Sequence, residues 1–144
     1  MRQARLKAAS TQRPTRVVIH CKEHEADVKK PCVFTMQGAI YDNGVPSGWG
    51  PVPVAGQQTR HEMNASILAR AAAGTTPRST TPATPWDPSI LWIIFMPSSR
   101  VEASHEPYVV EFVPEQYKAA GDKRGLWSLS VNASSGRTTL NRVH

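Results

Sequence analysis

The chain has two cysteines, Cys21 and Cys32, and the first of them lies between His20 and His24. Thiolate and imidazole groups are ligands of structural zinc, but a structural site needs four of them, usually supplied as two close pairs. Here only Cys21 and His24 form such a pair, and a strand would turn His20 and Cys21 to opposite faces. We therefore expect no metal ion at these residues, and nothing in the rest of the sequence predicts another cofactor.

A disulfide between Cys21 and Cys32 fits their spacing better than a metal ion does. If the chain folds back between Ala26 and Asp27, the two cysteines lie directly opposite each other, where their Cβ atoms approach the roughly 4 Å that a disulfide requires. Closing so short a loop would stabilise the fold by about 2–3 kcal/mol. No secretory signal is visible at the N-terminus, however, and intracellular thiols are usually reduced. The spacing thus predicts either a Cys21–Cys32 disulfide or two packed thiols.

Histidine is followed by glutamate at His24, His61 and His105, and such pairs could supply acid–base or metal chemistry. None of them continues as the H-E-x-x-H motif of zinc proteases, because Ala65 stands where that motif would place its second histidine after His61. The sequence also lacks the nucleophile elbow G-x-S-x-G, the Walker phosphate loop and the dinucleotide-binding motif G-x-G-x-x-G. We therefore expect no catalytic residues and favour a protein that is not an enzyme.

Positive charge gathers at the N-terminus. Six of the 17 Lys and Arg residues lie within residues 1–22, which contain no acidic residue, and the other 11 are matched by all 11 Asp and Glu. A flexible cationic segment can follow the phosphates of a polyanion without a preformed groove. The cations predicted to bind nucleic acid or another polyanion are Arg2, Arg5, Lys7, Arg13 and Arg16. The arm they occupy has no aromatic residue of its own on which a single strand could stack.

The same N-terminal segment allows two other interpretations. An arginine-bearing N-terminus without acidic residues is typical of a mitochondrial import sequence, and the segment could equally be a solvated tail without a partner. The longest apolar run, residues 90–96, is far too short to span a membrane. We therefore expect an intracellular, cytoplasmic protein without membrane contact, with a mitochondrial location as the alternative.

A hairpin is predicted to position the two cysteines. Alternation over residues 16–21 and 32–41 indicates two strands, and the fold-back between Ala26 and Asp27 makes the numbers of opposed residues sum to 53. Apolar residues then face each other on one side of the ribbon, and opposite charges face each other near the turn. The predicted pairs are Val17 with Met36, Ile19 with Phe34, Cys21 with Cys32, and Glu23 with Lys30.

The middle of the chain is expected to hold a loop and one helix. Asp42-Asn43-Gly44 is a tight-turn signal, and the Pro/Gly alternation after it predicts a loop packed by Trp49. A helix is predicted over about residues 59–73, because Thr59 and Glu62 form a capping box and alanines supply helix propensity. The Thr/Pro-rich segment 75–88 predicts an extended linker.

The second half of the chain is predicted to be β-rich. Residues 89–96 and 107–113 indicate strands, 115–125 one helical turn, and 126–143 a hairpin that turns within 132–136. Trp92 and Trp127 are expected in the core.

We therefore predict an α+β fold: mainly antiparallel strands, as a sandwich or barrel-like sheet, with one helix. Residues 1–15 would be a flexible, disordered basic arm and 16–144 a single β-rich domain. The leading hypothesis is a non-enzymatic binding or structural subunit, whose body also makes protein contacts or self-associates. The alternative is a small enzyme or ligand-binding barrel, with a pocket between the sheet and the helix at 59–73. The polar groups expected in that pocket are His20, Tyr41, His61 and Tyr108.

Overall fold

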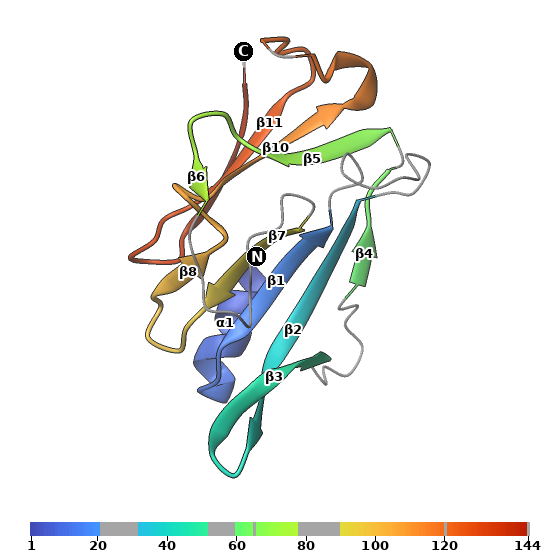
Figure 1. The fold of residues 1–144 in the computed structure, drawn as a ribbon. Helices are drawn as coiled ribbons and strands as arrows, with labels where there is room; N and C mark the ends of the chain where they lie inside the picture. Colours follow the sequence, from blue (N-terminus) through green and yellow to red (C-terminus); the bar gives the residue numbers. More distant parts are fainter. Residues whose placement is uncertain (21–31, 52–59, 65, 78–89, 120, 144) are drawn as a thin grey trace.

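The computed structural model describes residues 1–20, 32–51, 60–64, 66–77, 90–119 and 121–143. Within them the chain forms the helix α1 (Arg2–Thr11), the 3-10 turn η2 (Glu115–Tyr117) and a series of short strands (Figure 1). The strands are β1 (Thr15–His20), β2 (Val33–Asp42), β3 (Val45–Pro51), β4 (Arg60–Glu62), β5 (Ile67–Ala71), β6 (Thr76–Pro77), β7 (Ile90–Phe95), β8 (Val101–Ala103), β9 (His105–Glu106), β10 (Val109–Pro114), β11 (Trp127–Val131) and β12 (Thr138–Arg142). Mostly antiparallel sheets with one α-helix among these described residues confirm the α+β prediction.

The strands form two main sheets and one small ribbon. Sheet A has the order β3-β2-β1-β7-β8, with β4 paired to β2 at one end, and sheet B has the order β12-β11-β10-β5. The small ribbon pairs β6 with β9. β1 therefore lies in the middle of sheet A, hydrogen-bonded to β2 on one side and to β7 on the other.

The predicted register of the first hairpin is confirmed over the residues that the structure describes. Val17 pairs with Met36 and Ile19 pairs with Phe34, so the numbers of paired residues sum to 53 as expected. Cys21 and the Glu23–Lys30 pair lie outside the described residues. Apolar matching across a short ribbon was therefore sufficient to fix this register.

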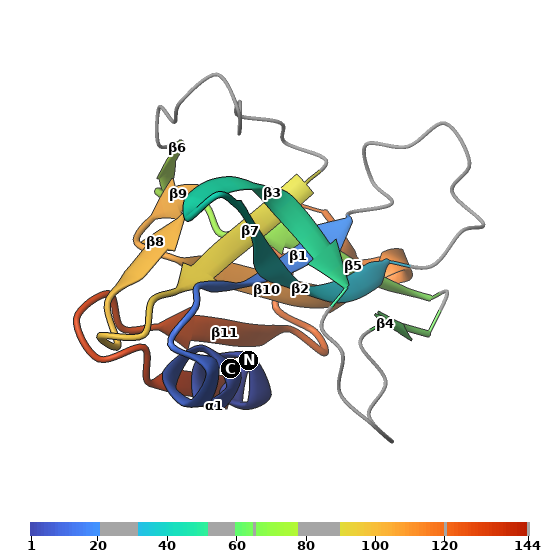
Figure 2. The ribbon, with the colours of Figure 1, turned by 90° about the horizontal axis from the view of Figure 1, so that it is seen from below.

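The two sheets and α1 share one hydrophobic core. Strands β1, β2, β7 and β8 of sheet A and β5, β10 and β11 of sheet B all contribute buried side chains to it. Figure 2 shows α1 on the same side of sheet A as β11. The largest fully buried side chains of this core include Ile19, Leu91, Ile93, Phe95 and Val110.

The prediction that residues 1–15 form a disordered arm is not confirmed, because Arg2–Thr11 form α1. Ala4 and Ala8, one helical turn apart, are both 0% exposed and belong to the shared core. Small side chains let the helix approach the sheet closely. The contact of α1 with the core is made by alanines, so the lack of a stripe of large aliphatic residues does not exclude it.

The prediction of a helix over residues 59–73 is wrong, because this segment contributes β4 and β5 instead. Asn64 Oδ1 accepts hydrogen bonds from the Ser66 backbone N–H and hydroxyl at 2.9 and 2.7 Å, a local turn that competes with helix formation. The side chains of Leu68 and Ala69, both in β5, are buried on opposite faces of sheet B. Burial on both faces of a strand outweighs the weak helix propensity of the alanines. The Glu62 carboxylate pairs with Arg60 at 2.7 Å.

The turn at Asn43-Gly44 is confirmed, whereas the loop predicted after it is a strand. Asn43 and Gly44 have φ values of 51° and 79°, as a two-residue type I′ turn requires, and Asp42 pairs with Val45 across it. The segment after the turn can form the strand β3 because β3 lies at the edge of sheet A. Pro46 and Pro51 have no backbone N–H group, and an edge strand tolerates that loss.

Replacing Gly44 by alanine is expected to destabilise the protein by about 1–2 kcal/mol, because a Cβ is unfavourable at a positive φ. The matched control is Gly48→Ala in β3. Both sites have open space around an added Cβ, but only Gly44 has a positive φ, of +79°. Urea unfolding of both variants measures the difference. Equal losses of stability would contradict the assigned turn.

Most predictions for the second half are confirmed. The strand at Ile90–Phe95, the turn at Glu115–Tyr117 and the hairpin Trp127–Val131/Thr138–Arg142 are all present. Trp92 is buried as expected, but Trp127, at the start of β11, is 43% exposed, so its predicted place in the core is wrong. Of the predicted linker, the structure describes 75–77, where Thr76–Pro77 form β6; the rest lies outside the described residues. No helix in the described part of the chain is long and apolar enough to cross a membrane.

Candidate functional site

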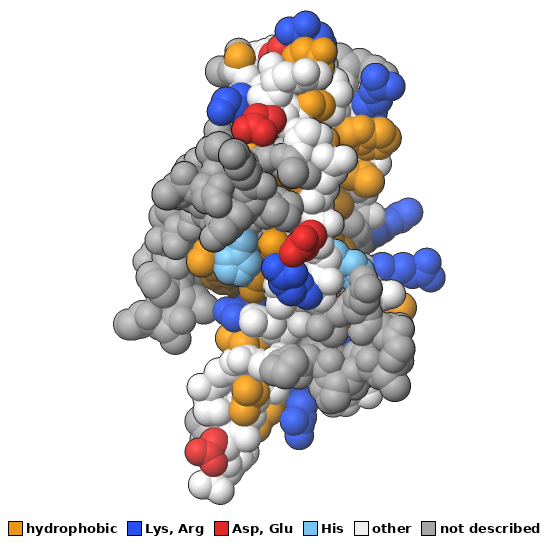
Figure 3. Space-filling view, turned by 90° about the vertical axis from the view of Figure 1, so that its right-hand side faces the viewer, with side chains coloured by type: hydrophobic (Ala, Val, Ile, Leu, Met, Phe, Trp, Pro, Cys, Tyr) orange, Lys and Arg blue, Asp and Glu red, His pale blue; other side chains and the backbone are white. Residues whose placement is uncertain are grey.

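The five cations predicted to bind a polyanion are divided between two sides of sheet A. Arg2, Arg5 and Lys7 lie on α1, which packs on the side of the shared core. The chain then reverses at Gln12, which has a φ of 56°, and carries Arg13 and Arg16 toward β1. On the face shown in Figure 3, the Lys and Arg side chains stand apart from one another instead of forming one patch.

Strand alternation separates the two faces of β1. Val17 and Ile19 point into the shared core, so Arg16 and Val18 belong to the other face. On that other face Val18 packs with Trp92 and Ile94 of β7 in a smaller apolar cluster. Trp49 of β3 packs against the same cluster and is half-buried.

The side chain of Arg16 is held in place by two neighbours on this face. Its guanidinium carbon lies 4.7 Å from the centre of the Trp49 ring, in a cation–π contact. Its Nε–H donates to Gln37 Oε1 at 3.0 Å, and one terminal nitrogen donates to the same oxygen. Gln37 is also the residue paired with Arg16 across the β1–β2 ladder. Burial lowers the pKa of Arg16 from its ordinary value, because the charged form loses contact with water.

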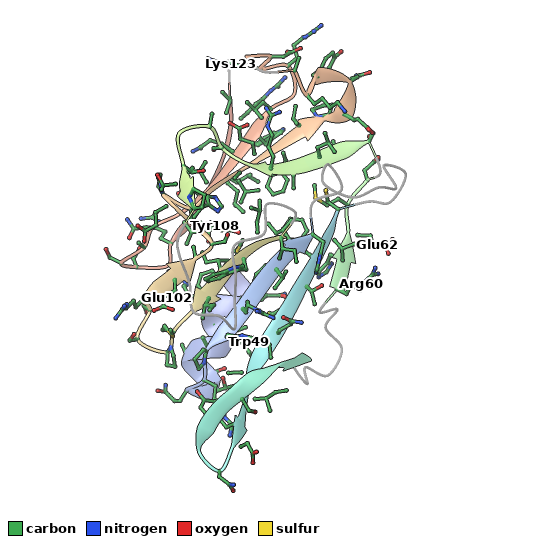
Figure 4. All side chains as sticks on the ribbon, in the orientation of Figure 1. Trp49, Arg60, Glu62, Glu102, Tyr108 and Lys123 are labelled. Carbon is green, nitrogen blue, oxygen red and sulfur yellow. The ribbon has the colours of Figure 1, made fainter. Side chains whose placement is uncertain are left out.

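A second cation–π pair lies nearby on the same hairpin. The guanidinium carbon of Arg13 is 5.2 Å from the centre of the Tyr41 ring. Gln37 and Tyr41 are four positions apart on β2 and thus on one face, and Trp49 is paired with Ala39 between them. We call Arg13, Arg16, Gln37, Tyr41 and Trp49 the arginine–aromatic face; Figure 4 labels Trp49 within it.

Two carboxylates of the described residues, those of Glu102 and Asp42, lie near this face. Glu102 lies two strands from Arg16, since Ile94 pairs with both of them, and its carboxylate contacts Arg100 at 3.6 Å. Asp42 follows Tyr41 at the hairpin turn and is exposed.

The sequence alone gave no indication of the aromatic half of this site. The N-terminal segment has no aromatic residue, and Tyr41 and Trp49 come from the next hairpin. The predicted register already placed Arg16 opposite Gln37, because their numbers sum to 53. Extending the register through the Asn43-Gly44 turn would have placed Trp49 opposite Gly38, on the other face, because the ladder shifts by one residue between Ile40 and Tyr41.

The alternative pocket predicted between a sheet and a helix at 59–73 does not form as expected, because that segment is β4 and β5. Its four predicted residues do not converge. His20 ends β1, Tyr41 lies at the opposite end of the β1–β2 hairpin, and His61 is exposed on β4. Tyr108 is buried in the shared core, whereas Tyr41 lies on the other face of sheet A with Trp49.

Tyr108 instead lines an open pocket of about 930 Å³ where β8 and β9 meet the β11–β12 turn; His105, Asn132 and Arg137 also line it. His105 is 0% exposed, and its ring lies 4.8 Å from that of Tyr108. Ser104 Oγ accepts a hydrogen bond from the Trp92 N–H and lies at hydrogen-bond distance, 3.1 Å, from His105 Nδ1. His105 Nε2 then donates to the Val109 carbonyl at 3.1 Å. Both ring nitrogens are engaged, which gives His105 a structural role.

Acidification is expected to destabilise the protein through His105. Burial lowers the pKa of His105, although its hydrogen bond to Val109 acts in the opposite direction. Below about pH 6.5 the unfolded chain therefore binds a proton that the native state excludes, and stability falls as the pH falls further. Urea unfolding at about pH 7.5 and pH 5.5 should show a larger loss for wild type than for His105→Gln. Equal losses for wild type and His105→Gln would contradict the assignment.

Neither a metal site nor a disulfide is established by the described residues. They contain no group of three or more His, Cys, Asp or Glu side chains that could hold a metal ion. Cys32 is buried, and its Sγ accepts a hydrogen bond from the Ala69 N–H at 3.4 Å. Because Cys21 lies outside the described residues, a Cys21–Cys32 disulfide stays a prediction.

Comparison with known proteins assigns no relative to this chain. The sequence matches no protein-family model, and no curated protein or solved structure is significantly similar to it.

Proposed function

We propose that this protein binds nucleic acid or another polyanion through the arginine–aromatic face and is not an enzyme. The observation that carries the proposal is the pair of guanidinium groups, Arg13 and Arg16, each lying over an aromatic ring on one face of the β1–β3 ribbon. Planar guanidinium groups bind phosphate oxygens with two parallel hydrogen bonds, which makes arginine the preferred residue for phosphate recognition.

Preorganisation supports binding at this face over binding by a free arm. An arginine on a disordered segment loses side-chain and backbone freedom when it binds a ligand, and that loss weakens the affinity. Arg16 has already lost much of this freedom, because Trp49 and Gln37 hold its guanidinium. The fixed group can therefore contact a phosphate at a lower entropic cost.

The cations of α1 are given a secondary role in this proposal. Arg2, Arg5 and Lys7 lie on a helix that packs against the opposite side of sheet A from Trp49. A short polyanion bound across Arg13 and Arg16 would not reach them. A longer strand would follow the face that carries Trp49 and would contact α1 only where it passes around the edge of the sheet.

Two variants of equal charge test the proposal. Arg13→Gln/Arg16→Gln and Arg2→Gln/Lys7→Gln each remove two positive charges, the first from the arginine–aromatic face and the second from α1. Fluorescence anisotropy with a labelled single-stranded 20-mer, at about 50 mM salt, should show roughly tenfold or greater loss of affinity for the first variant and less than about twofold for the second. Equal losses would mean that only net charge matters and would contradict the proposal.

The fold must be intact in both variants, which thermal melting by circular dichroism checks. Deleting residues 1–16 would be a poor substitute for these variants. The deletion removes Ala4 and Ala8 from the shared core together with Thr15, which is 1% exposed in β1. Loss of binding after such a deletion would follow from unfolding alone.

A further inference from the structure

We infer that the polyanion bound by the arginine–aromatic face is a single-stranded nucleic acid whose bases stack on that face. This inference rests on the polyanion-binding function proposed above and adds the class of ligand. A polyanion without bases, such as heparin, would use only the charge of Arg13 and Arg16. The aromatic partners of both arginines point to a ligand that also has flat, polarisable groups.

The two rings are neighbours on the sheet. Trp49 is paired with Ala39, and Tyr41 is the next residue of β2 on the same face. The ladder shifts register between these two positions, with one extra residue on β3. Both side chains are half-buried, so each is fixed by its surroundings and still reaches the surface. Adjacent nucleotides of one strand can therefore contact the two arginine–ring pairs together.

A planar guanidinium over a ring creates a platform for a base. One side of the Arg13 group faces Tyr41, and its other side is available to a further π system, because Arg13 is exposed. Proteins that bind single strands stack the bases on aromatic side chains and on arginine planes in this way. Each stacked base strengthens binding by about tenfold. In a duplex the faces of the bases are already stacked on one another, so a duplex cannot use the platform.

Arg16 also retains hydrogen-bond donors for the same ligand. A guanidinium has five N–H groups. Nε and one terminal nitrogen direct hydrogen atoms to Gln37 Oε1, and the second terminal nitrogen forms no part of that contact. Its N–H groups can donate to a phosphate oxygen or to a base carbonyl. Arg16 can thus contact the backbone of a strand while a neighbouring base stacks beside it.

The experiment separates charge from stacking by changing the ligand. The full chain is titrated into three labelled 20-mers: oligo(dT), an abasic oligodeoxynucleotide with the same phosphates but no bases, and a duplex. We expect oligo(dT) to bind wild type at least about tenfold more tightly than the abasic strand and more tightly than the duplex. Tyr41→Leu should weaken the binding of oligo(dT) about five- to tenfold and the binding of the abasic strand by a smaller factor, whereas Tyr41→Phe, which keeps the ring, should weaken the binding of oligo(dT) less than Tyr41→Leu does.

The results that would contradict this inference can be told apart from the results that would contradict the proposed function. Equal affinity of wild type for oligo(dT) and the abasic strand overturns the inference but leaves polyanion binding standing. Tighter binding of the duplex than of oligo(dT) also overturns it. If none of the three ligands binds at low salt, both the inference and the proposed function fail. The comparison of ligands uses wild type alone, so it decides the question even if Tyr41→Leu does not fold.

Discussion

Replacing Ala8 by aspartate is expected to destabilise the protein by about 3–5 kcal/mol, whereas the same change at Ala9 should cost less than about 1 kcal/mol. Ala8 is 0% exposed and packs with the shared core, and the neighbouring Ala9 is exposed on the same helix. A carboxylate at position 8 would be buried without a partner, which is among the most costly single changes in a protein. At position 9 it would remain in water.

Chemical unfolding of Ala8→Asp and Ala9→Asp measures this difference. The two variants have the same net charge and the same loss of helix propensity, so only the burial of the side chain differs. If residues 1–15 were the disordered arm that the composition suggests, both changes would be nearly neutral. Equal stability of the two variants would therefore contradict the docking of α1.

Replacing Leu91 by alanine is expected to reduce the free energy of unfolding by about 2–5 kcal/mol. Leu91 is 1% exposed on β7 and belongs to the core shared by the two sheets. The loss combines the missing apolar burial with the cavity left between sheets that cannot collapse onto it. For a domain of this size that is a large fraction of the whole stability.

Leu140→Ala is the control for this prediction, because it removes the same atoms from a side chain that is 55% exposed on β12. We expect it to change the free energy of unfolding by about 0.5 kcal/mol or less. Denaturant unfolding of both variants gives the comparison. A loss at Leu91 no larger than the loss at Leu140 would show that the sheets do not share the core described above.

Local signals in the sequence predicted the elements that depend on neighbouring residues. The β1–β2 register follows from matched apolar residues such as Val17 and Met36, and the Asn43-Gly44 turn follows from the φ values that these residues tolerate. The buried strand at Ile90–Phe95 follows from its continuous apolar run. In each case the pattern that specifies the element lies within the element.

The sequence-based predictions failed for segments whose structure depends on contacts with residues far away in the sequence. β5 is a strand because Leu68 and Ala69 are covered on both sides by residues far away in the sequence, and the alanine-rich pattern cannot report that. The docking of α1 likewise depends on a sheet that accepts two alanines. In both segments the structural role of the alanines depends on what packs against them, so their pattern alone does not predict it.

For the same reason, only part of the candidate site could be predicted from the sequence. The cations were evident from charge alone, and Arg16 opposite Gln37 was contained in the predicted register. Trp49 required β3, whose prolines predict a loop until its position at the sheet edge is known. The β2–β3 ladder also shifts register between Ile40 and Tyr41, which no turn signal indicates.

The salt dependence of binding to a single-stranded 20-mer tests the central claim most directly. Each phosphate contact on a single strand contributes about 0.7 to the slope of log affinity against log salt concentration. Arg13→Gln/Arg16→Gln should therefore lower that slope by about 1.4, while Arg2→Gln/Lys7→Gln leaves it at the wild-type value. A slope unchanged by loss of Arg13 and Arg16, or lowered equally in both variants, would contradict binding at the arginine–aromatic face.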